Sequence, residues 1–144
     1  MATMDAIRPE AILPEISLDV PFSRVAMVSP ASWDYFPGHH DPDYARAQGK
    51  RSIYLNTMAL GAFLDRVATD WLGPDWFIRG RVLRMQQSVC AGDILQAGGV
   101  VTAVNEEAGK IRDVVVDVTG RTANGICVTA QITLEPPGSR GHAG

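Results

Sequence analysis

The chain has few of the residues from which covalent or metal-based scaffolds are built. Only two cysteines, Cys90 and Cys127, and three histidines occur among its 144 residues. The cysteines lack the paired spacing of a zinc site, so we expect two reduced, partly buried thiols rather than a disulfide. Neither cysteine has a histidine beside it in the sequence, and no nucleophile elbow is present. These absences argue against covalent catalysis.

Long hydrophobic runs and blocks of basic residues are also missing. No apolar segment approaches the roughly 20 residues that cross a bilayer, and residues 1–14 lack the apolar core of a signal peptide. The net charge of -3, with 13 basic and 16 acidic side chains, argues against nucleic acid as a partner. The sequence therefore predicts a cytoplasmic protein with no membrane or nucleic-acid partner.

The length of 144 residues suits one domain with its own hydrophobic core. No internal repeat or linker divides the chain. We expect a loose N-terminal arm over residues 1–15, a single domain over residues 16–135 and a disordered tail over residues 136–144. His142 lies in that tail and is not expected to take part in chemistry.

Two short elements are predicted in the first third of the domain. Residues 23–28 have the composition of a short strand. Asp41, Pro42 and Asp43 have the order of an N-cap acid, a proline in the first turn and a second acid, which predicts the start of a helix. That helix should end at Gly49.

The longest helix should be capped by Asn56 or Thr57 and should stop at Gly73-Pro74. Residues 58–64 contain no charged side chain, so we expect this half to be buried nearly all round, with Met58 in the core. Apolar residues recur along the helix at helical spacing. They are Leu60, Phe63, Leu64, Val67, Ala68 and Trp71.

The remainder of the domain has the pattern of strands. Residues 77–87, 94–104 and 111–118 are separated by clusters of turn residues. Asn124-Gly125 is a hairpin signal that leads into a fourth, alternating strand. Gly98-Gly99 lies within a strand and predicts a bulge or a strong bend. Together with the long helix, these strands predict an α+β fold in which a curled antiparallel sheet wraps round one helix.

The segment from Asp34 to Asp41 holds two of the three histidines and a turn. Pro37 fixes its own φ and Gly38 can adopt backbone angles closed to other residues. The chain can therefore fold back and aim Asp34 and His39 into one cavity. A carboxylate beside an imidazole can move protons near neutral pH. The spacing alone is equally compatible with a polar turn that caps the next helix.

This segment resembles the Asp-x-Asn-Pro-x-His-x-Asp signature of MaoC-like (R)-specific enoyl-CoA hydratases, the hydratase 2 group of hot-dog proteins. Phe36 departs from the signature where the family has Asn, and Asn56-Thr57 stands where the family has His-Gly. The resemblance covers roughly residues 20–135 and implies a hot-dog fold. The residues that fit the family pattern are Asp34, Pro37, His39, Asp41, Ala45 and Gly49.

A narrower resemblance is to the small MaoC-like subunits of actinobacterial steroid side-chain degradation, which pair with a larger MaoC-like partner. It is carried by His39-His40-Asp41, Ala47-Gln48-Gly49, Asn56 and residues 70–74. The resemblance implies a homodimer, or a hetero-oligomer with such a partner. It also implies an acyl-CoA or acyl-carrier thioester as substrate, and no cofactor.

The activity implied by the resemblance is hydration of a trans-2-enoyl-CoA, or dehydration of the matching (R)-3-hydroxyacyl thioester. Asp34 and His39 would activate water and protonate the α-carbon, and the sequence leaves open which residue does which. The backbone N–H of Thr57 would stabilise the thioester oxyanion. The apolar Phe36 favours a bulky acyl group. Four residues are expected to line the pocket: Phe36, Pro37, Gly38 and Asn56.

Three other functions remain open at this point. One is a polyketide-type dehydratase, and another is a hot-dog thioesterase, whose acid usually lies on the central helix. Asp65 is the nearby acid there, and it shares a polar stripe with Thr69 that we expect to be solvated. The third is a non-catalytic subunit that completes a partner's site, but an intact Asp34/His39 pair argues against that role.

A metal site built from His39, His40 and Asp41 is disfavoured. Adjacent side chains rarely converge on one ion, and no further cluster of ligands completes a shell. We therefore expect no metal, with Asp41 acting as the cap of the next helix and His40 pointing away from the cavity.

Overall fold

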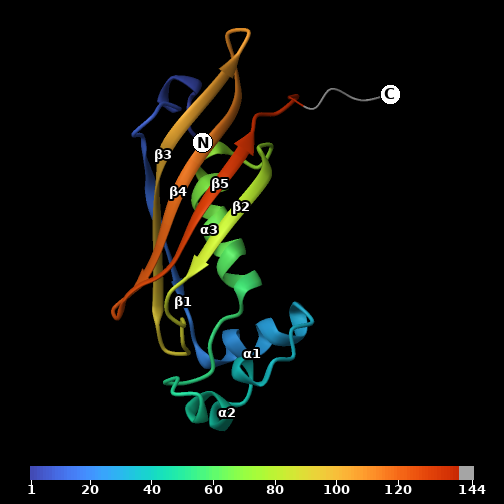
Figure 1. Cartoon of the computed structure of the whole chain (residues 1–144), viewed down its shortest axis with the longest axis vertical. Coiled ribbons are helices and arrows are strands. Elements are labelled where there is room, and N and C mark those ends of the chain that lie inside the picture. The colour runs from blue at the N-terminus through green and yellow to red at the C-terminus, as the bar shows by residue number, and fades with distance from the viewer. Residues whose placement is uncertain (140–144) are drawn as a thin grey trace.

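A five-stranded antiparallel sheet wraps round the long helix α3 in the computed structural model, which describes residues 1–139 (Figure 1). The strand order is β1-β3-β4-β5-β2. The predicted α+β architecture, a curled sheet round one central helix, is confirmed. The elements are η1 (Met4–Ala6), β1 (Ile12–Asp19), α1 (Phe22–Ala31), η2 (Pro37–His39), α2 (Pro42–Ala47), α3 (Thr57–Leu72), β2 (Phe77–Met85), β3 (Ile94–Glu107), β4 (Lys110–Thr122) and β5 (Gly125–Glu135).

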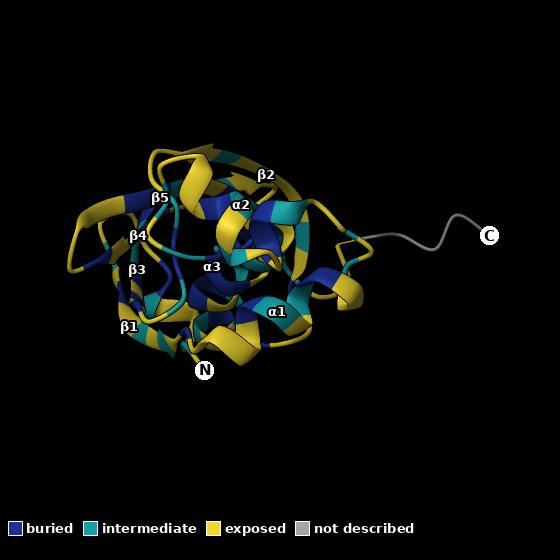
Figure 2. Cartoon of the chain, turned by 90° about the horizontal axis from the view of Figure 1, so that it is seen from below, coloured by how far each residue is buried: buried dark blue, intermediate teal, exposed yellow. Residues whose placement is uncertain are grey.

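The core lies between α3 and the concave face of the sheet. Val114, Val116 and Val118 of β4 are buried because alternate side chains of a strand point to the same face. Leu60 and Leu64 of α3 are fully buried on the side of the helix that meets the sheet. Figure 2 shows the buried residues gathered round α3, with exposed residues on the outer face of the strands.

The small helices α1, η2 and α2 gather at the N-terminal end of α3 (Figure 1). Asp41 caps α2 as predicted, since one of its carboxylate oxygens accepts hydrogen bonds from the N–H groups of Asp43 and Tyr44. This cluster of helices carries the segment that contains Asp34 and His39.

The strand predicted for residues 23–28 is wrong, because these residues belong to α1. Val25 and Ser29 are both buried, and their spacing of four places them on one face of a helix. The β-branched residues that indicated a strand therefore pack on one side of a short helix. Pro30 lies in the last turn, where it lacks the N–H that would bond the carbonyl of Ala26.

The strand that precedes the helices is β1, which starts within the range predicted as a loose arm. Ile12–Asp19 pairs with β3, and the N–H of Glu10 also donates to the carbonyl of Val101. Leu13 is buried in the core. The domain therefore begins before residue 16. Of the predicted tail, residues 140–144, including His142, lie outside the described residues.

The irregularity predicted at Gly98-Gly99 is present, but the extra residue lies in the partner strand. The register shifts between Leu13 and Ile16 of β1, opposite Gly98. Pro14 lies within this shift, where a residue without an N–H costs no ladder hydrogen bond. The Asn124-Gly125 turn joins β4 to β5 as predicted, and Gly125 has a φ of 111°.

The helix α3 runs from Thr57 to Leu72 as predicted, but its first half is not buried all round. Met58 is 49% exposed, and Ala62 and Arg66 are exposed as well. Their spacing of four forms one stripe along the side of the helix that the single sheet leaves uncovered. Within residues 1–139, no helix is long and apolar enough to cross a membrane.

Candidate active site

A turn at the end of α1 holds the backbone of Asp34. The N–H of Trp33 donates to the carbonyl of Pro30, and the N–H of Asp34 donates to that of Ser29. These two bonds form a Schellman motif, in which one residue must be left-handed; Trp33 takes that place with a φ of 57°. The buried Ser29 hydroxyl donates to the carbonyl of Asp34 at 2.6 Å. The Asp34 peptide is thus tied to the helix on both sides.

The turn η2 then brings His39 back toward Asp34. Pro37 occupies its first position, and Gly38 lies beneath the ring of Tyr54. A Cβ at residue 38 would lie 2.5 Å from the Tyr54 hydroxyl and 2.8 Å from the ring of Phe36. Only glycine fits between these two rings without displacing them.

The Asp34–His39 pair predicted from the sequence is assembled. His39 Nε2 lies 3.3 Å from Asp34 Oδ2, and His39 is 7% exposed. On the other side of the ring, Nδ1 lies 2.7 Å from the carbonyl oxygen of Tyr54. A carbonyl can only accept, so Nδ1 carries a hydrogen. In the neutral imidazole, Nε2 is then the unprotonated nitrogen, and it faces the carboxylate.

Aromatic rings enclose this imidazole. Phe36 meets the ring of His39 edge to face at a centroid distance of 5.5 Å, and Tyr54 does so at 5.1 Å. Phe36 also contacts Tyr44 at 5.5 Å. Burial, which is the largest cause, raises the pKa of the Tyr54 phenol, so this side chain stays protonated at neutral pH. The imidazole of His39 therefore has an aromatic ring on two sides and the Asp34 carboxylate on a third.

Asn56 is the N-cap of α3, one of the two predicted caps. Its side-chain oxygen accepts from the N–H of Ala59 at 2.9 Å, and its amide nitrogen donates to the hydroxyl of Ser32 at 2.7 Å. Asn56 is almost fully buried. It therefore joins the start of α3 to the end of α1, and so to the turn that carries Asp34.

The start of α3 offers free backbone donors. The first N–H groups of a helix have no partner within it, and Asn56 satisfies the one at Ala59. Within residues 1–139, the N–H groups of Thr57 and Met58 have no acceptor. The Thr57 side chain is engaged elsewhere, since its hydroxyl lies 3.3 Å from Met85 Sδ. The positive end of the helix dipole adds to these donors.

His40 and Asp41 have other contacts. The exposed His40 donates from Nε2 to the carbonyl of Tyr35 at 3.1 Å, and Asp41 caps α2. In the part of the chain that the structure describes, no three His, Cys, Asp or Glu side chains are grouped to hold a metal.

Asp65 is not on the solvated stripe that the sequence predicts. It forms an ion pair with Arg81 of β2, and its other oxygen is buried. The guanidinium lies against Gly61, since a Cβ there would be 2.8 Å from Arg81 Cζ. The absence of a side chain at Gly61 lets the cation reach under the sheet and cover the carboxylate. One oxygen of Asp65 is therefore occupied by Arg81, and among the described residues the buried Oδ1 has no hydrogen-bond partner.

Three supporting residues could not be recognised from the sequence: Ser29, Ser32 and Tyr54. Ser29 and Ser32 come after residues 23–28, the range that the sequence incorrectly predicts as a strand. Tyr54 acts through its carbonyl and through its ring, and a backbone acceptor leaves no signal in residue type. Only the hydrogen-bonded geometry identifies them.

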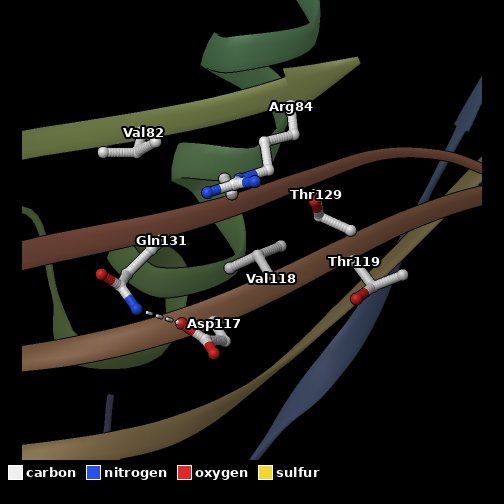
Figure 3. A pocket seen from close by; sticks show the side chains of 8 residues that line it. Val82, Arg84, Asp117, Val118, Thr119, Thr129 and Gln131 are labelled. Atoms are coloured by element: carbon white, nitrogen blue, oxygen red, sulfur yellow. Dashed lines mark hydrogen bonds between the residues drawn. The ribbon is translucent and has the colours of Figure 1, made fainter. Parts of the chain in front are cut away.

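A separate hollow of about 380 Å³ lies on the outer face of the sheet. Figure 3 shows its lining from β2, β4 and β5. Its single acid, Asp117, accepts a hydrogen bond from Gln131 at 3.0 Å, and Arg84 lies across from them. The lining of the hollow contains no imidazole, so it lacks an acid–base pair of the kind that Asp34 and His39 form.

Comparison with known proteins relates the chain to hydratases. It is 35% identical over 124 residues to the 3-oxo-4,17-pregnadiene-20-carboxyl-CoA hydratase beta subunit of Mycobacterium tuberculosis, covering 86% of this chain and 92% of that protein. The ChsH1-ChsH2 complex from the same organism contains a chain with a TM-score of 0.83 and 33% identity, covering 90% of this chain and 98% of that one. No family model matches.

The (R)-hydratase of A. caviae involved in PHA biosynthesis has the same fold. Its TM-score is 0.80 at 22% identity, over 90% of this chain and 97% of the other. The fold and the assembled turn thus define a hot-dog protein of the MaoC-like class. Within that class, the chain belongs to the family of MaoC-like hydratases, and it is a hydratase or dehydratase.

Proposed function

We propose that the chain adds water to a trans-2-enoyl-CoA, or removes it from the (R)-3-hydroxyacyl thioester, with Asp34 and His39 as acid and base. The observation that carries this proposal is the 3.3 Å approach of His39 Nε2 to Asp34 Oδ2 in a turn walled by Phe36 and Tyr54. Acyl-CoA thioesters are intracellular metabolites, and we propose a cytoplasmic location for this enzyme.

Hydration breaks the C2–C3 π bond and forms a C3–O and a C2–H bond. One member of the Asp34–His39 pair takes a proton from water as the water oxygen attacks C3. The electron pair moves to the thioester oxygen, where the free N–H of Thr57 would stabilise the negative charge. The pair then delivers the proton taken from water to C2, which restores the thioester.

The bond from His39 to Tyr54 orients the imidazole toward Asp34 but does not decide which of the two residues takes the proton from water. Because Nδ1–H is held by the Tyr54 carbonyl, Nε2 keeps its lone pair on the side of Asp34. A water molecule that contacts both groups could be deprotonated by either one. Either Asp34 or His39 can therefore act as the base, and with both assignments the reaction takes place at this pair.

For the acyl group, we propose a bulky polycyclic one. Phe36 replaces the hydrogen-bonding side chain of the family signature, and its ring meets the imidazole edge to face. The relative from M. tuberculosis is named for a pregnadiene-carboxyl-CoA, a thioester of that kind. Apolar walls favour such a group over a short one, because the free energy of transfer grows with the apolar area buried.

For the assembly, we propose a hetero-oligomer with a larger MaoC-like partner. The relative is a beta subunit, and the ChsH1-ChsH2 structure is a complex of two proteins. The strand β2 is one edge of the sheet, and Met58 and Met85 are exposed beside it. Unpaired strand edges are usually covered by another chain, so we place the partner along β2 and the exposed stripe of α3.

The direct test follows the loss of enone absorbance with crotonyl-CoA and with a polycyclic 2-enoyl-CoA, using this chain alone and mixed with candidate partners. We expect hydration of the polycyclic substrate at a higher kcat/KM than that of crotonyl-CoA. Thioester hydrolysis, measured as released thiol, should stay at background because Asp65 is paired with Arg81. Release of thiol without hydration would replace the proposal with a thioesterase.

A further inference from the structure

The segment between α2 and α3 holds the imidazole of His39 through main-chain atoms. The N–H of Tyr54 donates to the carbonyl of Gly38 at 3.2 Å, and the carbonyl of Tyr54 accepts from His39 Nδ1 at 2.7 Å. The position of one peptide carbonyl thus fixes which nitrogen of His39 carries the hydrogen. Any shift of Tyr54 would release that constraint.

The opposite edge of the same segment is bonded to the loop between β2 and β3. The N–H of Leu55 donates to the carbonyl of Val89 at 2.9 Å, and the N–H of Ala91 donates to the carbonyl of Ile53 at 2.8 Å. Residues 53–55 therefore lie as a short strand between the turn of His39 and this loop. The loop forms the outer support of the Tyr54 carbonyl.

An ion pair between the half-exposed Arg51 and the buried Asp93 joins the two ends of this support. The side chain of Asp93 is 7% exposed, and both of its oxygens accept from Arg51 Nη2, at 2.8 and 2.7 Å. Asp93 Oδ2 also accepts from the N–H of Cys90 at 2.9 Å. The hydrogen bond to Asp93 is the largest cause that raises the pKa of Arg51. A buried carboxylate without such partners would be strongly disfavoured.

We propose that Arg51 and Asp93 are positioning residues for the reaction: their ion pair locks residues 53–55 against the β2–β3 loop, so that the Tyr54 carbonyl holds His39 with Nε2 directed to Asp34. Neither side chain touches the imidazole. The expected change in kcat rests on the proposed function. The expected change in the tautomer of His39 rests on the hydrogen bonds alone.

The chain contains a matched control for this pair. The side chain of Asp113 in β4 is 4% exposed and accepts from Arg112 at 2.7 Å and from Asn105 at 2.5 Å. Its burial is similar to that of Asp93, and like Asp93 it pairs with one arginine and accepts one further N–H, here from a side-chain amide instead of the backbone. None of its partners contacts the turn that carries Asp34 and His39. Asp93→Asn and Asp113→Asn therefore remove equivalent charges, only one of which supports the site.

The kinetic test compares these two variants with the parent in whichever assembly is active. We expect Asp93→Asn to lower kcat about 10- to 100-fold while KM stays within about twofold, the size of effect that misplacing a catalytic group produces. Asp113→Asn should keep the parental kcat, although both variants lower the melting temperature. Arg51→Met should match Asp93→Asn, and Arg51→Lys, which keeps the charge, should recover part of the loss.

The second test reads the imidazole without any substrate. Long-range ¹H–¹⁵N spectra of uniformly labelled protein, with His39 assigned through His39→Ala, should show the Nδ1–H tautomer in the parent and in Asp113→Asn. Asp93→Asn and Arg51→Met should show a mixture of tautomers. This readout distinguishes the two proposals, since a parent that hydrates no enoyl-CoA but shows these tautomer changes would contradict only the proposed function.

The positioning proposal would be overturned by Asp93→Asn keeping both the parental kcat and the parental tautomer. Equal losses of kcat in Asp93→Asn and Asp113→Asn would also overturn it, because a general loss of stability would then explain both. If Asp93→Asn fails to fold, the half-exposed Arg51 takes its place, and Arg51→Met and Arg51→Lys decide the outcome by the same two readouts.

Discussion

At the scale of single residues, the proposed chemistry depends on the side chains of Asp34 and His39 and not on the polar residues beside them. We expect Asp34→Asn and His39→Ala each to lower kcat about 10²- to 10⁴-fold, the usual contribution of a general acid or base. Both groups lie on a turn outside the hydrophobic core, so the fold should survive, as near-parental circular dichroism and melting temperature would confirm.

His40→Ala is the matched control for His39→Ala. His40 is the neighbouring residue, but it is exposed and its ring bonds the carbonyl of Tyr35. We expect this variant to retain most of the parental kcat in the same assay. A loss as deep as that of His39→Ala would mean that the reaction uses the other histidine.

Trp33 gives a prediction about stability at the same scale. A left-handed conformation costs a non-glycine residue roughly 1–2 kcal/mol, and Trp33 is 83% exposed, so it recovers little by burial. We expect Trp33→Gly to raise the free energy of unfolding by up to about 1 kcal/mol, after the entropy cost of glycine. A large decrease, measured by urea denaturation, would show that the indole makes a contact that outweighs the strain.

The contact between Asp34 and His39 could be predicted from the sequence because Pro37 and Gly38 between them define a turn. The supports of the pair could not. Ser29 holds Asp34 through a helix-ending motif whose left-handed position is a tryptophan, where the usual signal is glycine. Tyr54 orients His39 through a carbonyl that every residue type possesses.

At the scale of elements, the start of α3 is predicted to stabilise the oxyanion. Thr57 is the first residue of the helix, a position where proline is well tolerated, and Asn56 before it is extended, as the residue before a proline prefers. Thr57→Pro removes the N–H and should lower kcat on the order of 10²- to 10³-fold. Thr57→Gly keeps the N–H and should retain activity.

The comparison requires equal helix content in the two Thr57 variants, checked by circular dichroism. Equal inactivity of the glycine and proline variants would mean that the side chain of Thr57, rather than its N–H, is needed. Full activity of the proline variant would assign the oxyanion to another donor, for which the free N–H of Met58 is the first candidate.

The β3–β4 hairpin gives a prediction about pH. The hydrogen bond from Asn105, the largest cause, and the ion pair with Arg112 lower the pKa of Asp113, against the opposing effect of burial. A carboxyl whose pKa is lower in the folded state adds stability above its unfolded pKa of about 3.9, and this stability is lost as pH falls through the folded value. Asp113→Asn should therefore lower the melting temperature by a few degrees at pH 7.

The difference between parent and Asp113→Asn should shrink as pH is lowered below about 4, because the parental carboxyl then becomes protonated as well. Calorimetry across this range measures it. A difference in melting temperature that stays constant down to pH 2 would mean that packing, rather than charge, accounts for the effect.

Elements whose signals lie in adjacent residues can be predicted from the sequence, and elements that depend on distant contacts cannot. The caps of α2 and α3 and the Asn124-Gly125 turn depend on residues next to one another, and they were predicted correctly. The helix α1 was misread because Val25 and Val28 favour a strand locally, while burial of Val25 and Ser29 against the rest of the fold selects the helix. Met58 was placed in the core because composition does not show how far one sheet reaches round a helix.

At the scale of the whole molecule, the uncovered side of α3 and the adjoining edge β2 are expected to be an interface. We expect light scattering of the chain alone, 15.5 kDa as a monomer, to show a homodimer at micromolar concentration. Met58→Lys should weaken it, because a charge would enter the exposed apolar stripe. Ile12→Lys, which adds the same charge at the opposite edge strand β1, should not.

A monomeric parent with full activity would contradict the shared interface. Weakening of the dimer by Ile12→Lys and not by Met58→Lys would move the interface to β1. The sequence alone does not locate this surface, because the order of strands, and hence which two are edges, depends on pairing between residues far apart in the chain.

The measurement that tests the account most directly is hydration of a polycyclic 2-enoyl-CoA by the reconstituted assembly in which only this chain carries both Asp34→Asn and His39→Ala. The partner stays unchanged, and light scattering confirms that the assembly forms. We predict that turnover falls at least about 10²-fold relative to the parental assembly. Turnover equal to that of the parental assembly would contradict the account, because the reaction would then take place entirely in the partner.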